Sequence, residues 1–282
     1  MKADQHHSRE ERQPTLGARS GVGVALSSDP WGSDRGSNFL VIAGHVLPTG
    51  SESATGIRAG QVATVHTDTC RWGIKDGRMK AVVFQGAKEP LEVQEVDRPD
   101  CDDDGVVVET EACGICRSDW HAWQGDWGWI GLQPTPGLVF GHEPVGRVVE
   151  AGDNVSEFSE GDLVTNPFNL SDGTCPYCQA GRANICEKSI PMGFVPFQPG
   201  AFAEEYPVRD ADQNLVAVPD GVDAMDIAGL GCRFATAFHG VGTRADITPG
   251  DWVAVHGCGG VGLSAVHVAS ALGGNVIAID IV

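Results

Sequence analysis

The pattern of apolar and polar positions divides the chain at Met79. Before this residue the sequence is rich in Gly, Ser, Thr and Asp, and it keeps no sustained strand-like or helix-like period. From Met79 onward, MKAVVFQGAKEPLEVQEVDRP alternates in the way that a short β-hairpin does. We therefore interpret residues 1–78 as a disordered leader, with translation beginning at Met79. A genuine flexible extension is the alternative.

The charge distribution supports the same division and narrows the class of protein. Residues 1–78 carry nine Lys and Arg against eight Asp and Glu, whereas residues 79–282 carry ten against thirty. Such an acidic surface makes nucleic acid and anionic membranes poor partners, and it suits a protein kept soluble at high salt, as in an acidic proteome. No apolar run reaches 18 residues, so we expect no membrane span, no signal peptide and a cytoplasmic location.

The cysteines are grouped in a way that indicates metal binding rather than disulfides. Cys113 and Cys116 form a CxxC in EACGICRSDWHAW, and His142 with Glu143 follows in GHEPVGRVVEAGDNV. Cys232 stands much later, among small residues in GLGCRFATAFHG. A lone His or Cys is more often a buried structural residue than a ligand, but two thiolates and one imidazole form a catalytic zinc set.

Two of these segments carry a family resemblance. GHEPVGRVVEAGDNV fits the signature of the zinc alcohol dehydrogenases, and CRSDWHAWQGDW is similar to the segment that holds their catalytic cysteine. The chain from Met79 to Val282 thus resembles a zinc-dependent alcohol dehydrogenase of the medium-chain dehydrogenase/reductase superfamily. The resemblance implies that Cys116, His142 and Cys232 are the catalytic zinc ligands, whereas Cys113 matches no ligand position.

The resemblance also implies roles around the zinc. Glu143 corresponds to the glutamate beside the metal, and Asp119 to the acid that orients the histidine ligand. Ser118 and His121 match the relay that carries the substrate's proton toward solvent, and Arg117 matches a residue that pairs with the cofactor pyrophosphate. Trp127 and Phe168 match positions that line the substrate cleft, which indicates a narrow pocket and small alcohols. Ordinary turn polarity and core packing are the alternatives for these residues.

A second cysteine group lies in DGTCPYCQAGRANICE. Cys175, Cys178 and Cys186 resemble three of the four ligands of the family's structural zinc lobe, and Asp172 stands where the fourth cysteine would be. An aspartate oxygen is an acceptable zinc ligand, so we expect a structural zinc here. A metal-free lobe is the alternative, because the substitution of a ligand is also how such sites are lost.

The end of the chain contains a glycine-rich turn between two apolar runs. Gly257, Gly259 and Gly262 form GxGxxG after WVAVH and before VGLSAVHVASAL, and Asp280 ends the next apolar run. A turn between strand and helix lets backbone N–H groups meet a pyrophosphate. An acid at the end of the second strand accepts hydrogen bonds from the ribose hydroxyls and repels a 2′-phosphate, so we expect NAD rather than NADP.

These observations predict an α/β fold with a large β part. We expect a GroES-like antiparallel β-barrel domain over residues 79–222 and an incomplete Rossmann (doubly wound) domain over 223–282, truncated at the C-terminus. A complete sheet of this kind has about six strands, so we expect the 282-residue chain to be poorly soluble and to show negligible activity.

The expected function is zinc-dependent hydride transfer between an alcohol, or an aldehyde or ketone, and NAD, with zinc and NAD as cofactors. The expected partner is therefore a small-molecule alcohol or aldehyde, and we expect a full-length form to be a homo-oligomer. A polyol or formaldehyde dehydrogenase of the same superfamily, and an inactive zinc-binding fragment of a truncated gene, remain as alternatives.

Overall fold

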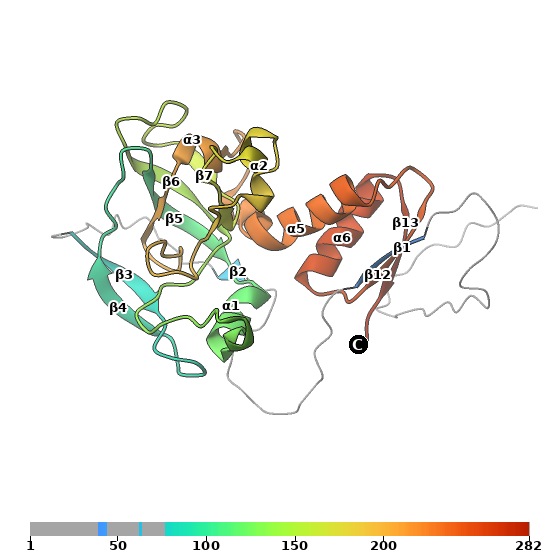
Figure 1. Cartoon of the computed structure of the whole chain (residues 1–282), viewed down its shortest axis with the longest axis horizontal. Helices are drawn as coiled ribbons and strands as arrows, with labels where there is room; N and C mark the ends of the chain where they lie inside the picture. Colours follow the sequence, from blue (N-terminus) through green and yellow to red (C-terminus); the bar gives the residue numbers. More distant parts are fainter. Residues whose placement is uncertain (1–38, 44–61, 64–76, 282) are drawn as a thin grey trace, which may run out of the picture.

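The structure is a computed structural model that describes residues 39–43, 62–63 and 77–281. Its larger part is built on an antiparallel sheet in which the strands follow the order β10-β5-β6-β7-β11, with β2 paired to β5. The bounds of these strands are β2 Val62–Ala63, β5 Val106–Gly114, β6 Pro144–Ala151, β7 Leu163–Thr165, β10 Glu205–Val208 and β11 Val216–Ala217. The strands wrap around a common interior (Figure 1).

The segments that carry the predicted site residues form short helices and hairpins between the strands of this sheet. The hairpin expected after Met79 is confirmed, because β3 (Arg78–Val83) pairs antiparallel with β4 (Glu92–Asp97). The remaining elements of this part are α1 (Arg117–Gln124), η1 (Gly128–Ile130), β8 (Asn169–Leu170), α2 (Pro176–Gln179), η2 (Ala183–Ile185), β9 (Ile190–Pro191), α3 (Ala211–Asn214) and α4 (Ala224–Ile227).

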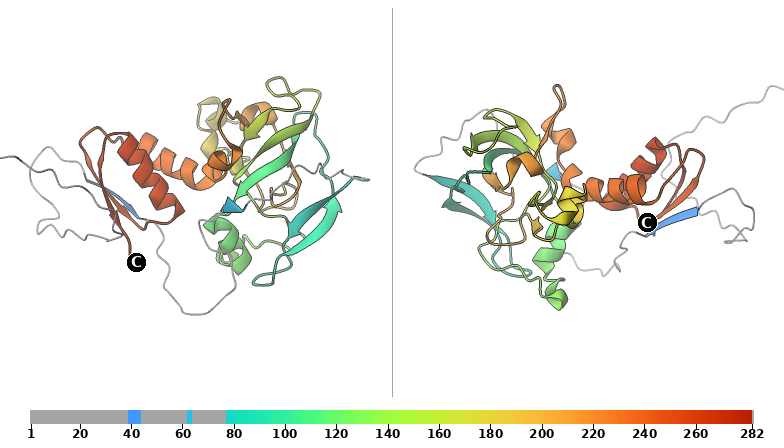
Figure 2. Two further views of the ribbon diagram at one scale, coloured as in Figure 1. Left: turned by 180° about the vertical axis from the view of Figure 1, so that it is seen from behind. Right: turned by 45° about the horizontal axis from the view of Figure 1, so that its top comes forward.

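A run of helical turns leads from the larger part to a parallel sheet (Figure 1). It consists of η3 (Leu230–Phe234), α5 (Ala235–Phe238) and η4 (His239–Arg244), where η3 and η4 are π-helical. The predicted strand–turn–helix–strand follows as β12 (Trp252–His256), α6 (Gly260–Ala271) and β13 (Asn275–Ile279), with β12 parallel to β13. Figure 2 shows α6 packed on one face of this sheet.

The structure also contains two strands that the sequence analysis did not predict. β1 (Phe39–Ala43) and β2 both fall within the segment interpreted as a disordered leader. β1 lies parallel to β12 on the edge opposite β13, which gives the order β1-β12-β13. Residues 77 and 78 of the expected leader are also described, and Arg78 is the first residue of β3. The other residues of the expected leader lie outside the described residues.

Each part has its own apolar core. In the larger part Val106, Val108 and Val148 pack with Tyr206 and Met192 inside the antiparallel sheet. The core of the smaller part joins Val253 and Val255 of β12 to one face of α6, and that face consists of Ala265, Val268 and Ala269. The fold is therefore α/β with a large β part, as expected, although the strand pairing of the described residues does not close into a complete barrel.

No helix in the described part of the chain is long and apolar enough to cross a membrane.

Candidate active site

Asp119 ties together the first two predicted zinc ligands. Cys116 is the N-cap of α1, and its backbone N–H donates to Asp119 Oδ2 at 2.9 Å, which forms the capping box that starts the helix. The other oxygen, Oδ1, accepts from His142 Nδ1 at 3.0 Å and from the Gly141 N–H at 3.3 Å. Since a carboxylate only accepts, the proton of the imidazole is on Nδ1, and the lone pair of Nε2 is directed away from Asp119.

The three predicted ligands meet beside this carboxylate. Metal-binding atoms of Cys116, His142 and Cys232 lie within 4.8 Å of one another, and the two Sγ atoms are 3.9 Å apart. Tetrahedral zinc with Zn–S bonds of about 2.3 Å needs an S–S separation of about 3.8 Å. His142 is fully buried, and its Nε2 has no hydrogen-bond partner among the described residues. A buried nitrogen without a partner, facing two thiols, fits a zinc ion.

The electrostatics of this group favour a thiolate at Cys116. A hydrogen bond from Cys232, together with contacts to His142 and the Ser118 backbone N–H, lowers the pKa of Cys116 to about 3 against the effect of burial. The same hydrogen bond and burial raise the pKa of Cys232. Burial lowers the pKa of His142, but the charge and hydrogen bond of Asp119 and the contacts with Cys116 together raise it to about 10. A divalent cation would replace these protons.

Glu143 directly follows the predicted ligand His142 in the chain and is fully buried. Its Oε1 accepts from the Arg233 backbone N–H at 2.9 Å, and its Oε2 forms an ion pair with Arg233 Nη2 at 2.8 Å. Burial and then the negative charge of Cys116 raise the pKa of this carboxyl. The side chain of Glu143 is therefore positioned by Arg233, a residue that was not among the predicted site residues.

The predicted relay and pyrophosphate residues lie on α1. Arg117 is exposed at the start of the helix, where its guanidinium stacks over the Trp120 ring at 4.2 Å. Ser118 is half-buried one position along. The His121 Nδ1 atom lies 2.7 Å from Asp126 Oδ2, at the last turn of the helix. The helix thus begins directly after Cys116, the predicted zinc ligand, and places His121 beside a partly exposed carboxylate.

Aromatic rings form one wall of the site. The Phe168 ring lies 6.3 Å from the His142 ring, and the Phe194 ring lies 4.8 Å from it. Trp127 packs edge-on against Phe194, with the centroids 5.2 Å apart. Trp127 and Phe168, the two predicted pocket residues, are therefore linked through the rings of Phe194 and His142. Phe194 could not be predicted as a pocket residue, because it stands in GFVPFQPG, where its sequence context is that of an ordinary core residue.

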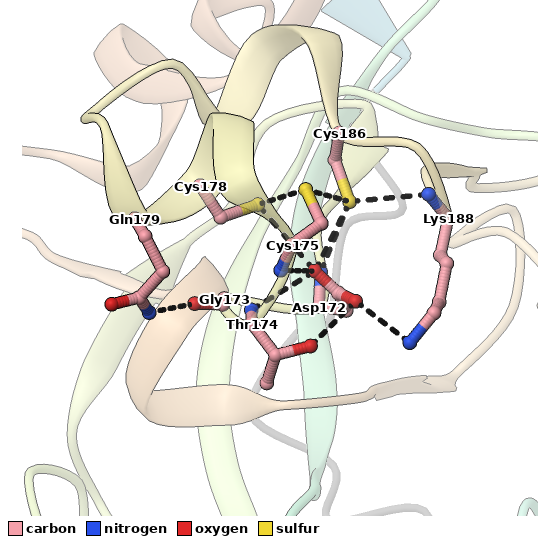
Figure 3. A network of polar contacts seen from close by, with 8 residues as sticks. All are labelled: Asp172, Gly173, Thr174, Cys175, Cys178, Gln179, Cys186 and Lys188. Atoms are coloured by element: carbon pink, nitrogen blue, oxygen red, sulfur yellow. Dashed lines mark hydrogen bonds and ion pairs between the residues drawn. The ribbon is translucent and has the colours of Figure 1, made fainter.

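The four residues of the second cysteine group surround a common point. Figure 3 shows Asp172 facing the sulfurs of Cys175, Cys178 and Cys186, and the four donor atoms lie within 4.8 Å of one another. Cys175 Sγ is 3.5 Å from Cys178 Sγ and 3.9 Å from Cys186 Sγ. These separations are close to the tetrahedral edge of about 3.8 Å, and they are too long for a disulfide.

The aspartate of this group is held in place by its neighbours. Asp172 Oδ1 accepts from the Thr174 and Cys175 N–H groups, while Oδ2 binds the Thr174 hydroxyl at 2.8 Å and Lys188 Nζ at 3.1 Å (Figure 3). The Thr174 hydrogen bond is the main reason why the pKa of Asp172 is lowered. Burial and the neighbouring thiols raise the pKa of Cys178 to about 12, so this thiol stays protonated unless a metal displaces the proton.

In the glycine-rich turn, Gly257 and Gly262 stand where only glycine fits, whereas Gly259 stands where a side chain would have room. Gly257 has a φ of +90°, and a Cβ on Gly262 would lie 1.7 Å from the Gly257 carbonyl oxygen. A Cβ on Gly259 would meet nothing within 4 Å, so the backbone is open to an approaching ligand at this point. Asp280 Oδ2 accepts from the Cys258 N–H at 2.5 Å, which places the acid beside the turn. This arrangement fits a dinucleotide.

The fold and the two cysteine groups define the class of protein, and comparison with known proteins agrees. Residues 102–220 match the family described as Alcohol dehydrogenase GroES-like domain. The chain is 38% identical to an alcohol dehydrogenase of Geobacillus stearothermophilus over 204 residues, which are 72% of this chain and 58% of that relative. Over the part that aligns, the chain belongs to the alcohol dehydrogenase family.

Solved structures place the chain in the same group. Alcohol dehydrogenase TADH from Thermus sp. ATN1 is 35% identical with a TM-score of 0.68, over 72% of this chain and 58% of that one. A cobalt and zinc bound thermostable alcohol dehydrogenase from Pyrobaculum aerophilum is 32% identical with a TM-score of 0.64, over 71% of this chain and 59% of that one. The chain thus spans just under three-fifths of the length of these relatives.

Proposed function

We propose that the protein is a zinc-dependent oxidoreductase that transfers hydride between an alcohol, or an aldehyde or ketone, and NAD. The observation that carries the proposal is the meeting of Cys116, His142 and Cys232 around a buried Nε2 atom that has no partner among the described residues. Three protein ligands with an open fourth position are the arrangement of a catalytic zinc, and not of a structural one.

When bound, zinc supplies Lewis-acid polarisation of the substrate oxygen, and the dinucleotide supplies the hydride acceptor or donor. Cys116, His142 and Cys232 would hold the metal, and Asp119 fixes the tautomer of His142 through Oδ1. The second group, Asp172, Cys175, Cys178 and Cys186, would hold a structural zinc.

The proton of the alcohol leaves along α1 in this proposal. Ser118 lies two residues after the ligand Cys116, and His121 lies one turn further, at the partly exposed Asp126. A hydroxyl and an imidazole in this order can pass a proton from the buried site toward solvent. The rings of Trp127, Phe168 and Phe194 would shield the site from water, which strengthens the interaction of every charge inside it.

The position of Asp280 supports NAD as the cofactor. Its carboxylate lies at the end of β13 and binds the N–H of Cys258 in the turn. A negative charge at this position favours free ribose hydroxyls and disfavours a 2′-phosphate. Arg117, on the exposed start of α1, would contribute positive charge toward the pyrophosphate.

Metal and dinucleotide binding test the proposal directly. We expect purified protein to bind zinc at both cysteine groups and NAD at the turn. In a full-length form we expect NAD-dependent oxidation to be strongest with small alcohols, because of the aromatic rings beside His142. Zinc content by mass spectrometry, NAD titration followed by tryptophan fluorescence, and a panel of alcohols, polyols and formaldehyde are the measurements. Protein that binds no zinc at Cys116, His142 and Cys232 would contradict the proposal.

A further inference from the structure

An arginine beside the candidate catalytic metal site has no role in the mechanism above. Arg233 directly follows the ligand Cys232 on η3. Its backbone N–H donates to Glu143 Oε1, and its guanidinium forms an ion pair with Glu143 Oε2. Glu143 in turn follows the ligand His142. The side chains of both residues are nearly excluded from water, at 15% and 0% exposure. One ion pair therefore connects the neighbours of two metal ligands.

Three glycines make the space that this arginine fills. A Cβ on Gly114 would lie 2.8 Å from Arg233 Nη2, and a Cβ on Gly229 would lie at the same distance from that atom. A Cβ on Gly260 would lie 2.8 Å from Arg233 Cδ. A side chain at any of these positions would press on Arg233, so the three glycines leave the space that the arginine side chain occupies.

These glycines belong to different parts of the molecule. Gly114 ends β5 in the antiparallel sheet, and Gly229 precedes η3. Gly260 is the first residue of α6 and lies within the GxGxxG motif. The aliphatic stem of Arg233 thus rests on the start of the dinucleotide helix, while its guanidinium holds a carboxylate next to the metal ligands.

We propose that Arg233 is a positioning residue that couples dinucleotide binding at the glycine-rich turn to the metal ligands. This inference rests on the proposed function. The planar fork of the guanidinium can hold Glu143 and keep its stem against Gly260 at the same time, whereas a lysine would offer only a point charge. Ordering of the turn by a dinucleotide would therefore fix Arg233, and with it Glu143 and Cys232.

The coupling can be measured without turnover. The catalytic site is loaded with Co²⁺, and the NAD dissociation constant is measured with and without the metal. By linkage, NAD must change the affinity for Co²⁺ by the same factor by which the metal changes the affinity for NAD. A shift of the ligands on NAD binding would also change the visible cobalt spectrum. We expect the wild type to bind NAD at least about fivefold more tightly with the metal than without it, which is the low end of typical coupling between sites.

Substitution of Arg233 should remove this coupling. We expect Arg233→Met to reduce it below about twofold and to abolish the spectral change on NAD addition, with Arg233→Lys between the two. Arg233→Met alone leaves the Glu143 carboxylate buried and unpaired, which can impair folding. The double variant Glu143→Gln/Arg233→Met removes that carboxylate as well, so the coupling can be measured even if the single variant folds poorly. Arg209→Met, which removes a charge from a surface pair with Asp102, is the matched control and should behave as the wild type.

The outcomes separate the inference from the proposed function. Wild-type coupling in Arg233→Met or in the double variant overturns the inference alone, as does a wild type that binds both ligands without coupling. A wild type that binds no NAD overturns the proposed function and the inference with it. Loss of coupling in both variants, with normal binding of each ligand measured separately, supports the inference.

Discussion

Asp119 accepts a hydrogen bond from Nδ1 of His142 at 3.0 Å, across 23 positions of sequence, while its second oxygen caps the helix that begins after Cys116. One fully buried carboxylate therefore sets the geometry of two candidate zinc ligands. Its side chain is 1% exposed, so water does not compete for these hydrogen bonds.

Asp119→Asn should weaken zinc binding at the candidate catalytic site by about 10–100-fold, which is the usual effect of losing a partner of a ligating histidine. The amide can present its NH₂ group to Nδ1 and so favour the wrong tautomer. Competition with a chromophoric chelator measures the change. Asp126→Asn is the control, because Asp126 contacts His121 and no ligand; equal loss in both variants would contradict the orienting role.

The two cysteine groups should account for two zinc ions per chain. We expect Cys116→Ser to lose the catalytic zinc only and Cys178→Ser to lose the structural zinc only. Cys113→Ser should keep both ions, because Cys113 packs in the core of the antiparallel sheet and belongs to neither group. Metal content by mass spectrometry decides this, and unchanged zinc in either ligand variant would remove that assignment.

Zinc binding at the structural lobe should release protons and strengthen as the pH rises. Burial and neighbouring thiols raise the pKa of Cys178 from its ordinary value of 9.0 to about 12 in the metal-free lobe. Folding therefore favours the protonated form of Cys178. The contribution of this thiol to the stability of the metal-free lobe is lost as the pH rises from about 9 toward 12. At neutral pH zinc must displace this proton, so an indicator dye should report at least one proton per zinc. If the number of protons released on zinc addition is the same in Cys178→Ser, the protons come from a group other than Cys178.

Two glycines of the turn should respond to alanine in different ways. Gly262→Ala should destabilise the fold by about 1–3 kcal/mol, because overpacking costs this much and its Cβ would meet the Gly257 carbonyl oxygen. The gain of up to about 1 kcal/mol in helix propensity does not compensate. Gly259→Ala should leave stability unchanged, since its Cβ meets nothing within 4 Å, but it should weaken NAD binding. Thermal denaturation and NAD titration distinguish the two, and equal melting temperatures would contradict this interpretation.

Asp280→Gly should weaken NAD binding and improve tolerance of NADP, because it removes a ribose acceptor and a repulsive charge together. Titration with both cofactors gives the preference as a ratio. Asp280→Asn is the informative companion, since it removes the charge and keeps an acceptor. A ratio that is the same in the wild type and both variants would place the selection elsewhere.

The sequence by itself determined which residue types are available for chemistry. Three motifs can be recognised from the sequence alone: the CxxC pairs, the histidine in GHE and GxGxxG between apolar runs. Each depends on local geometry, namely a helix start, a turn or a close backbone approach. The hairpin after Met79 and the parallel pair β12 and β13 could be predicted for the same reason.

Only the tertiary structure decided how these pieces meet. Cys232 lies 3.9 Å from Cys116 although 116 positions separate them in the sequence. The hydrophobic pattern around either cysteine does not indicate that the two residues meet. Phe194 and Arg233 carry no local mark, since an aromatic beside glycine and an arginine after a cysteine are common in sequences. Arg233 becomes distinctive because three glycines from separate elements leave room for one guanidinium next to a buried carboxylate. Burial and charge at that site are properties of the packed chain, and a one-dimensional pattern does not encode them.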